Sequence, residues 1–503
     1  LIWCSPIFKS PNDDNGYDVS DYRAIMNEFG TMEQFDELLT GLHERGIKLL
    51  LDLVPNHSSD EHFWFQESRK SKDNPYRDYY FWQDEPPNNW LSFFSGSAWE
   101  YDDLAEQYYL HLFSKKQPDL NWENPKVRQE MYDIMRFWFE KGVDGFRIDV
   151  LPFISKKMDF PDIDPDNFAD AVWHTYANGP RIHEFLREMN QRALQDFEVT
   201  TIAEGIGISP AQALDYVGED RQELDMLYHF DHMMINYGEG GKYDPKDWNL
   251  QTFKAIFSQW HAALEDRGWI SLFLDNHDYP RMVSRFGNDR EHRVEAAKLL
   301  ATLLLSLRGT PCIYQGSEIG MSNIEMERLE DFDDVEIRNL VKEMRERGED
   351  PEAMIPIFNQ MGRDNARTPI QWDDTANAGF TTGEPWLKVN PNYREINVAA
   401  ALADPDSVFY YYQKMLRLRK THSTLIYGDY ADLLPESEEV YVYRRWDAAG
   451  EYAVFLNFST NPIALTNFSK YLRGEVLIGN YSHVTPLELQ AWEARIYRLD
   501  QAI

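Results

Sequence analysis

Seven short apolar runs, each ending in polar residues, constrain this chain more than any other feature of its sequence. Between them lie stretches of helical spacing, such as residues 32–46, 126–142 and 295–309, that end at a glycine, a common helix stop. Strand alternating with helix predicts a parallel sheet that is buried on both faces. The runs are LIWCSPIF from Leu1, IKLLLDLVPNH from Ile47, VDGFRIDV from Val143, VTTIAEG from Val199, LDMLYHFD from Leu224, WISLFLDNHD from Trp269 and TPCIYQGSE from Thr310.

The polar residues of these runs fall where each predicted strand ends. A (β/α)8 TIM barrel explains this placement, because that fold builds its active site at the carboxyl ends of its strands. The alternative is a doubly wound open sheet, which typically carries a glycine-rich phosphate turn after an early strand, and the sequence has none. Seven strands would leave a barrel with open edges, and the chain begins inside an apolar run. We therefore expect the first βα unit to lie outside this sequence.

The domain organisation follows from changes in pattern along the chain. We expect an α/β protein in which residues 1–57 and 119–426 form the catalytic barrel. Residues 58–118 are rich in aromatic and small polar residues with little periodicity, and they predict an inserted, loop-rich subdomain B. Alternating apolar residues predict a C-terminal antiparallel β domain over residues 427–503. The charged stretch 326–348 predicts a solvated helix.

The composition excludes several classes of partner. A formal net charge of −35 argues against nucleic acid and against anionic membranes, since both require a positive surface. No run of about 18 apolar residues predicts a membrane span, and two cysteines exclude a disulfide-built scaffold. No signal peptide is evident, so we expect a cytoplasmic protein. Aromatic residues make up 14% of the chain, which suits both a core and platforms for stacking sugars.

Three carboxylates fall at the ends of different predicted strands: Asp149 in GFRIDV, Glu204 in TIAEG and Asp278 in LFLDNHD. In a barrel these strand ends converge on one substrate. Cleavage of a glycosidic bond requires two carboxyl groups, one to attack or stabilise the anomeric carbon and one to protonate the leaving oxygen. The pattern therefore predicts a glycoside hydrolase.

A cation and two imidazoles accompany these carboxylates. Arg147 lies two residues before Asp149, so both side chains point to the same face of the strand. A fixed cation there would keep Asp149 ionised, as a nucleophile must be. His57 and His277 also stand at strand ends and are expected to donate hydrogen bonds to sugar hydroxyl groups.

Eight segments give the chain a family resemblance. In order they are DDNGYDVSDY, DLVPNHSS, QPDLNWENP, DGFRIDV, TIAEG, FLDNHD, YQGSEIGM and GRDNARTPIQWDD. Together they resemble the α-amylase superfamily, and most closely its oligo-1,6-glucosidase and dextran glucosidase branch. The resemblance covers the predicted barrel, with little beyond it except the C-terminal β domain.

The resemblance implies a retaining reaction through a covalent glucosyl-enzyme, with Asp149 as nucleophile, Glu204 as acid/base and Asp278 as the third carboxylate. Carboxyl groups about 5–5.5 Å apart and a raised pKa for Glu204 would suit this chemistry. Either Arg363 or Arg367 is implied to reach the glucose pocket, with Arg363 preferred. A pair of Asp14 and Arg363 would close the pocket floor and favour cleavage at a chain end. The other implied pocket residues are Tyr17, His57, Phe113, Arg147 and His277.

Linkage preference is predicted from the residue after the nucleophile. Val150 resembles branch members that prefer α-1,6 bonds, whereas members that prefer maltose carry Thr or Ala there. The segment GIGI after Glu204 and the segment LYHFDHM depart from the family pattern on the aglycone side. The expected partner is a small oligosaccharide or disaccharide, and no cofactor is required. The resemblance places a structural calcium site in a loop of the first βα unit, which we expect to lie outside this sequence, so no metal ligand is assigned.

Four alternatives accompany the leading hypothesis of an exo-acting α-1,6-glucosidase. A sucrose isomerase or transglucosidase would carry a second arginine where this chain reads MERLEDFDD. An α-1,4-preferring α-glucosidase would share the same scaffold. A trehalose-6-phosphate hydrolase would need a basic phosphate clamp. A transporter heavy chain without catalysis would have lost catalytic carboxylates, and all three are present.

Overall fold

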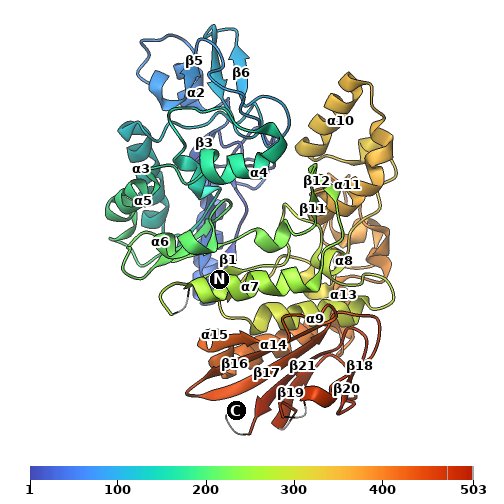
Figure 1. The fold of residues 1–503 in the computed structure, drawn as a ribbon. Helices are drawn as coiled ribbons and strands as arrows, with labels where there is room; N and C mark the ends of the chain where they lie inside the picture. Colours follow the sequence, from blue (N-terminus) through green and yellow to red (C-terminus); the bar gives the residue numbers. More distant parts are fainter. Residues whose placement is uncertain (265, 469, 473, 501–503) are drawn as a thin grey trace. The chain divides into compact units, whose positions relative to one another are not determined.

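The chain divides into two units, each described here by itself. A computed structural model describes residues 1–264, 266–468, 470–472 and 474–500 (Figure 1). The first unit comprises Leu1–Phe230, Leu264–Trp269 and Arg338–Glu343. The second comprises Asp231–Ala263, Ile270–Ile337 and Met344–Ile503.

Five of the seven apolar runs form one parallel sheet in the first unit. Its strand order is β1-β4-β8-β9-β10. Parallel strands end at the same edge, and this places the predicted catalytic residues of two runs, Asp149 and Glu204, beside Tyr228 of a third. Asp149 follows β8, Glu204 ends β9, and Tyr228 ends β10 opposite Glu204. The strands are β1 (Ile2–Trp3), β4 (Leu49–Leu53), β8 (Gly145–Ile148), β9 (Thr200–Glu204) and β10 (Met226–Tyr228).

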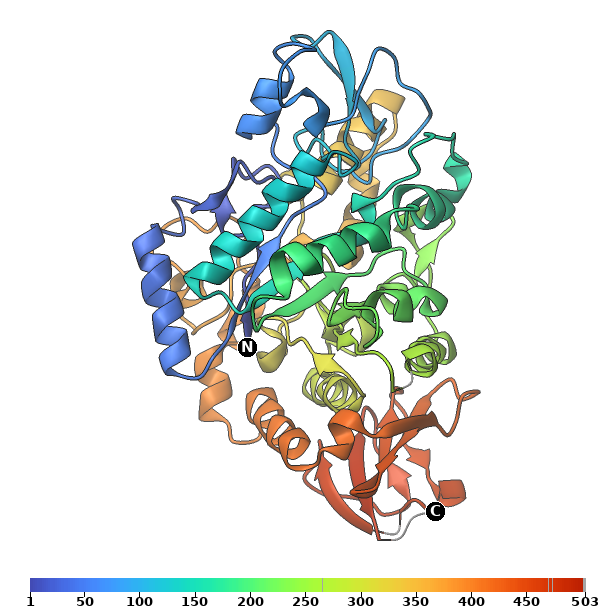
Figure 2. The same ribbon diagram turned by 90° about the vertical axis from the view of Figure 1, so that its left-hand side faces the viewer.

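Amphipathic helices cover this sheet. Helix α1 (Met32–Glu44) begins with a capping box between Thr31 and Gln34, which satisfies N–H groups at its first turn. Helix α3 (Pro125–Lys141) ends at Gly142, whose φ of 104° suits the left-handed C-cap, as its sequence predicted. Helices α3 and α5 (Ile182–Met189) pack side by side over the strands (Figure 2). Phe139 of α3 packs on Phe146 of β8, with ring centroids 5.2 Å apart.

The segment 58–118 contains more regular structure than its lack of periodicity indicated. A short helix, α2 (Phe63–Ser68), precedes a three-stranded antiparallel sheet of order β5-β7-β6. The strands escaped the sequence pattern because they have only two to four residues, too few to establish alternation. They are β5 (Trp82–Gln83), β6 (Trp99–Asp102) and β7 (Gln107–Leu110).

The remaining two apolar runs form a parallel pair in the second unit. These are β13 (Ser271–Leu272) and β14 (Thr310–Pro311). Helix α9 (Arg293–Ser306) is buried along almost its whole length, because it packs against α14 (Val408–Thr421) on one side and strands of the C-terminal sheet on the other.

The prediction of a solvated helix over residues 326–348 was wrong in its first part. Within the stretch 326–348, the helix α10 (Val335–Arg347) begins nine residues after Met326, and the preceding residues contain only a short 3-10 turn. Asp334 caps the helix and is fully buried. A buried carboxylate requires a partner, and that partner is described with the site below.

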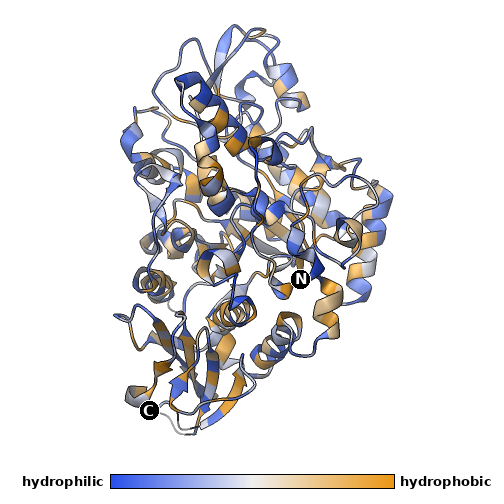
Figure 3. Ribbon diagram, turned by 90° about the vertical axis from the view of Figure 1, so that its right-hand side faces the viewer, coloured by the Kyte–Doolittle hydropathy of each residue, from blue (hydrophilic) through white to orange (hydrophobic). Residues whose placement is uncertain are grey.

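The C-terminal strands form the antiparallel sheet that their alternation predicted. Its order is β15-β16-β17-β21-β19, and apolar and polar residues stand side by side along it (Figure 3). Its core contains Val442, Phe455 and Tyr497. The strands are β15 (Asp429–Asp432), β16 (Val440–Asp447), β17 (Gly450–Asn457), β19 (Gly474–Gly479) and β21 (Ala494–Leu499), with a separate pair of β18 (Ile463–Ala464) and β20 (Glu488–Leu489).

The other elements are mostly short, except for the 15-residue helix α7. In the first unit they are β2 (Phe8–Lys9), β3 (Asp21–Ile25), α4 (Phe168–Ala171) and α6 (Ala213–Val217). Elsewhere they are β11 (Tyr237–Gly238), β12 (Gly241–Pro245), α7 (Leu250–Leu264), α8 (Met282–Phe286), α11 (Ile355–Met361), α12 (Asp364–Arg367), α13 (Val398–Ala403) and α15 (Thr424–Tyr427). Among the described residues, none of these helices combines the length and the apolarity that a membrane crossing requires.

The close approach of β8 and β9 yields a stability prediction. A Cβ atom on Gly145 would lie 1.9 Å from the carbonyl oxygen of Thr200, its partner in the ladder. Gly145→Ala should therefore lower the free energy of unfolding by about 2–4 kcal/mol, measured by urea denaturation. The control Gly41→Ala, within α1, should raise it by up to about 1 kcal/mol. Equal effects of the two changes would contradict the register.

Candidate active site

The Arg147 guanidinium is the centre of the site in the first unit. Its Nη1 donates to Asp52 at 2.9 and 3.2 Å and to Asp149 at 2.5 Å. Its Nη2 donates to Glu204 at 2.5 Å, and its Nε donates to the hydroxyl of Tyr228 at 2.8 Å. The side chain is only 1% exposed. One cation therefore joins the carboxylates of three adjacent parallel strands, and the prediction that it faces Asp149 is confirmed.

The electrostatics of this cluster follow from its burial. Burial raises the pKa of Asp149 well above its usual range; Arg147 opposes this, whereas the charge of Glu204 and a hydrogen bond between the two carboxyl groups add to it. Burial lowers the pKa of Arg147, but the charges of Asp52 and Glu204 more than compensate and leave it well above its usual value. Burial thus outweighs the guanidinium at Asp149, contrary to the expectation that Arg147 keeps this carboxyl group ionised, while the cation itself stays charged.

The backbone just after Asp149 is strained. Val150 has φ 33° and ψ 42°, a left-handed conformation that a β-branched residue rarely adopts. This conformation directs its N–H to Glu204 Oε2, at 3.1 Å. Its buried side chain packs in an apolar cluster with Phe153 and Val172. Packing of this kind can hold a strained residue in place, and such strain commonly occurs at functional sites.

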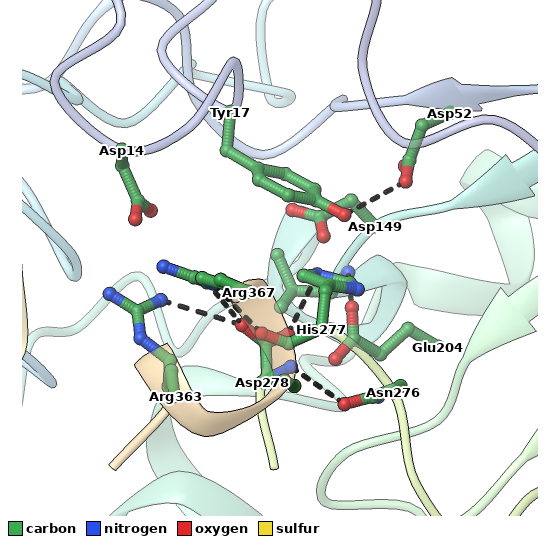
Figure 4. Close-up of polar contacts among 12 residues, drawn as sticks. Asp14, Tyr17, Asp52, Asp149, Glu204, Asn276, His277, Asp278, Arg363 and Arg367 are labelled. Carbon is green, nitrogen blue, oxygen red and sulfur yellow. Dashed lines mark hydrogen bonds and ion pairs between the residues drawn. The ribbon is translucent and has the colours of Figure 1, made fainter. Parts of the chain in front are cut away.

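A polar loop supplies Asp14 and Tyr17. The fully buried carboxylate of Asp18 accepts the backbone N–H groups of Asp13 and Asp14, at 2.9 and 3.1 Å, and so fixes the loop. The Tyr17 hydroxyl donates to Asp52 Oδ2 at 2.9 Å (Figure 4). Asp14 and Tyr17 are both buried, at 4% and 6% exposure.

His57 and Phe113 lie together beside this loop. Their ring centroids are 5.1 Å apart. Gln117 places its amide nitrogen 3.2 Å from both His57 Nε2 and Asp14 Oδ2. Burial lowers the pKa of His57 to about 4, against the opposing charges of Asp119 and Asp14. The imidazole is therefore neutral at pH 7.

In the second unit, His277, Asp278 and Arg367 form a compact group (Figure 4). His277 Nε2 lies 2.9 Å from Asp278 Oδ2, and Arg367 Nη2 donates to Asp278 Oδ1 at 3.0 Å. Arg367 Nε also donates to the backbone carbonyl of His277 at 2.9 Å. Burial raises the pKa of Asp278, but His277, Arg367 and Arg363 more than offset this and hold it well below its usual range.

Arg363 has a partner that the sequence did not reveal. Its Nε and Nη2 donate to Asp334 Oδ1 at 2.9 and 2.6 Å, whereas its Nη1 lies 3.4 Å from Asp278 Oδ1. Asp334 is the buried cap of α10, and Glu336 lies 3.9 Å from the same guanidinium. Both candidate arginines thus reach Asp278, and Arg367 does so at the shorter distance. The pairing of Asp14 with Arg363 stays a prediction.

The structure thus brings together two sets of predicted residues, one in each unit. Sequence reasoning missed Asp52, Tyr228, Gln117 and Asp334. Asp52 had a usable signal, because it interrupts the apolar strand LLLDL. Tyr228 and Gln117 had none, since both residue types are ordinary in their segments. Among the described residues, no group of three or more His, Cys, Asp or Glu side chains is arranged to hold a metal ion.

Comparison with known proteins identifies the family. Residues 1–428 match the family described as alpha amylase, catalytic domain. The chain is 52% identical to oligo-1,6-glucosidase of Parageobacillus thermoglucosidasius, over 99% of this chain and 91% of the relative. It is 47% identical to glucan 1,6-alpha-glucosidase of Streptococcus pneumoniae, over 98% of this chain and 90% of the relative.

Solved structures give the same result for the fold. A variant of isomaltulose synthase from Erwinia rhapontici NX5, in complex with its natural substrate sucrose, aligns with a TM-score of 0.95 at 44% identity, over 99% of this chain and 91% of that chain. Trehalulose synthase MutB from Pseudomonas mesoacidophila MX-45 aligns with a TM-score of 0.94 at 44% identity, over the same shares of the two chains. The chain belongs to the alpha-amylase family, and the predicted fold class is confirmed.

The buried cluster around Arg147 generates a stability prediction. Arg147→Met leaves three buried carboxylates without their cation, and should cost about 3–5 kcal/mol of unfolding free energy at pH 8. The loss should shrink at pH 5, because carboxyl groups whose folded pKa values are raised bind protons and favour the folded state below those values. Urea denaturation of the wild-type protein and the variant at both pH values measures this loss of unfolding free energy.

A matched control distinguishes the loss of the buried Arg147 cluster from the loss of an ordinary surface ion pair. Arg136 pairs with Asp196 at 2.8 Å near the surface. Arg136→Met should cost less than about 1 kcal/mol at either pH. A loss for Arg147→Met that is equally small, or that grows on acidification, would contradict the charge cluster.

Proposed function

We propose that this protein is a retaining, exo-acting α-glucosidase that hydrolyses terminal α-1,6-linked glucose from isomaltose and short isomalto-oligosaccharides. It is a glycoside hydrolase of the alpha-amylase family. The observation that carries the mechanism is the carboxyl pair of Asp149 and Glu204, which a single guanidinium, that of Arg147, bridges at 2.5 Å on each side. Carboxyl groups this close leave no room for a water between them, and this favours retention over inversion.

The two carboxyl groups divide the reaction. In the active protonation state, Asp149 is ionised and attacks the anomeric carbon, while Glu204 gives its proton to the glycosidic oxygen. The leaving sugar departs with that proton, and a glucosyl ester forms on Asp149. Glu204 then takes a proton from water, whose oxygen attacks the anomeric carbon and frees Asp149. Arg147 stabilises the nucleophile, and the Val150 N–H holds Glu204 in place.

Polar groups suited to sugar hydroxyl groups are proposed to bind the glucose unit. Asp278 remains ionised because of His277, Arg367 and Arg363, and its oxygens suit the sugar hydroxyl groups next to the reacting carbon. His57, Asp14 and Tyr17 supply further hydrogen bonds, and Phe113 supplies an aromatic wall.

The preference for α-1,6 bonds rests on Val150 and on the relatives. Val150 is fixed in its unusual conformation on the aglycone side, directly after the nucleophile. Relatives at 52% and 47% identity are named oligo-1,6-glucosidase and glucan 1,6-alpha-glucosidase. One of the curated relatives, at 47% identity, is named alpha-glucosidase, which keeps the α-1,4-preferring alternative.

A second candidate is sucrose isomerisation or transglucosylation. It is favoured by the isomaltulose and trehalulose synthases at 44% identity. The sequence argument against it is the missing second arginine in MERLEDFDD, where Arg328 stands alone.

We place the protein in the cytoplasm, with the catalytic barrel in residues 1–57 and 119–426, subdomain B in 58–118 and the β domain in 427–503.

A substrate panel tests the proposal. The protein is incubated separately with isomaltose, maltose, sucrose and trehalose, and the products are followed by chromatography. We expect glucose from isomaltose at a far higher kcat/KM than from maltose, with α-glucose as the first product seen by NMR. Isomaltulose or trehalulose from sucrose would establish the second candidate instead.

Removal of the nucleophile gives a sharper prediction. Asp149→Asn keeps the shape of the side chain but cannot form the glucosyl ester, so kcat/KM for isomaltose should fall by about 10⁴-fold or more. Asp162→Asn, an exposed site on the acidic segment 161–166, is the matched control and should leave kcat/KM unchanged. Substantial turnover by the Asp149→Asn variant would contradict the assignment of Asp149 as the nucleophile.

Linkage preference has its own test. Val150→Thr keeps the volume and the β-branch, so the backbone should hold its conformation while the aglycone side gains a hydroxyl group. The ratio of kcat/KM for isomaltose over maltose should fall about tenfold, the scale of one small contact in a binding pocket. An unchanged ratio, with both activities intact, would show that linkage is chosen elsewhere.

A further inference from the structure

The ammonium group of Lys156 lies in the first unit among buried oxygen atoms that the proposed reaction does not use. Its Nζ is 2.8 Å from Asn56 Oδ1, 2.8 Å from Asp119 Oδ2 and 2.6 Å from the carbonyl of Phe153. Lys156 is 2% exposed, and Asn56 and Asp119 are 0% exposed. An ammonium has three donors and no acceptor, so these oxygens satisfy it completely.

Two opposite charges fix which way the Asn56 amide points. Lys156 can only donate, so the amide oxygen must face it. The carboxylate of Asp119 can only accept, and Asn56 Nδ2 lies 3.2 Å from it. A reversed amide would set its N–H against the ammonium and its oxygen against the carboxylate. The orientation therefore follows from the chemistry of the neighbours.

The second amide hydrogen of Asn56 faces the His57 ring. Asn56 Nδ2 lies 3.2 Å from His57 Nδ1. A neutral imidazole has one donor nitrogen and one acceptor nitrogen. Nδ1 must be the acceptor here, and the ring proton then sits on Nε2.

The opposite tautomer would be less stable. It would let Nε2 accept from Gln117, whose amide nitrogen lies 3.2 Å away. It would also set Nδ1–H against the Asn56 amide, which two full charges hold in place. Gln117 is held by one charge, that of Asp14, and by the backbone N–H of Ser114. Its nitrogen already has Asp14 Oδ2 as an acceptor, so it does not require His57.

We propose that Lys156 is a positioning residue that sets the tautomer of His57 through Asn56, so that the imidazole offers an N–H donor on its Nε2 side. A sugar hydroxyl oxygen would then accept from His57. The consequence for substrate binding rests on the proposed function, but the tautomer itself does not. Two side chains, Asn56 and His57, separate Lys156 from the sugar, so Lys156 acts through hydrogen bonds alone.

Nitrogen NMR on protein with ¹⁵N-labelled histidine tests the tautomer directly. The His57 signals are assigned by their loss in His57→Gln. We expect Nε2 protonated and Nδ1 unprotonated at pH 7. In Asn56→Asp, a side chain of the same size, a carboxylate oxygen faces the ring, so the proton should move to Nδ1. A wild-type proton on Nδ1, or an Asn56→Asp variant that keeps the proton on Nε2, would overturn the proposal.

Lysine variants test whether the Lys156 ammonium sets the His57 tautomer by orienting Asn56. Lys156→Met should remove the preference of His57 for the tautomer protonated on Nε2, so that signals of both tautomers appear. The neighbouring exposed Lys157 provides the control, and Lys157→Met should keep the wild-type signals. If Lys156→Met does not fold, the Asn56→Asp result decides. A folded Lys156→Met with the wild-type tautomer would contradict the role of the ammonium.

Kinetics separate this inference from the proposed function. Asn56→Asp should raise KM for isomaltose about tenfold, the scale of one lost hydrogen bond, with a smaller change in kcat. Lys157→Met should change neither. If the wild-type protein cleaves no α-glucoside, the proposed function fails, while the NMR result still decides the tautomer. If KM stays unchanged although the tautomer switches, His57 does not donate to the sugar.

Discussion

A buried guanidinium beside three carboxylates is the interaction on which the first unit depends. Arg147 and its partners lie on adjacent parallel strands, and each would be costly to bury alone. The register of β4, β8 and β9 brings them to one point, and the close approach at Gly145 fixes that register. The same charges that stabilise the sheet edge therefore assemble the proposed nucleophile and acid.

Surrounding groups orient this cluster through backbone and amide contacts. The strained Val150 directs its N–H to Glu204, Asp18 shapes the loop of Tyr17, and Tyr17 reaches back to Asp52. In the second unit, Asp334 holds Arg363 while Arg367 reaches Asp278. Each unit thus carries its own network of oriented polar groups.

The sequence predicted the parts that depend on periodicity and on strand ends. All seven parallel strands were predicted, and Arg147 was placed correctly beside Asp149, because strand geometry fixes both. It could not predict the left-handed Val150, since β-branched residues ordinarily indicate extended backbone. It also misjudged Asp334, because a charged stretch indicates solvent unless the partner, Arg363, is known to lie nearby in space.

The central claim is that Asp149 forms a covalent bond to glucose, while Arg147 stabilises the nucleophile and Glu204 acts as the acid/base. The most direct measurement is to trap that bond. The protein is mixed with 5-fluoro-α-D-glucosyl fluoride, which slows breakdown of the glucosyl-enzyme, and is digested and analysed by mass spectrometry. The account predicts one added fluoroglucosyl group, on the peptide that contains Asp149. A label on any other carboxylate, or rapid turnover of the reagent with no labelled peptide under conditions that trap a retaining enzyme, would contradict it.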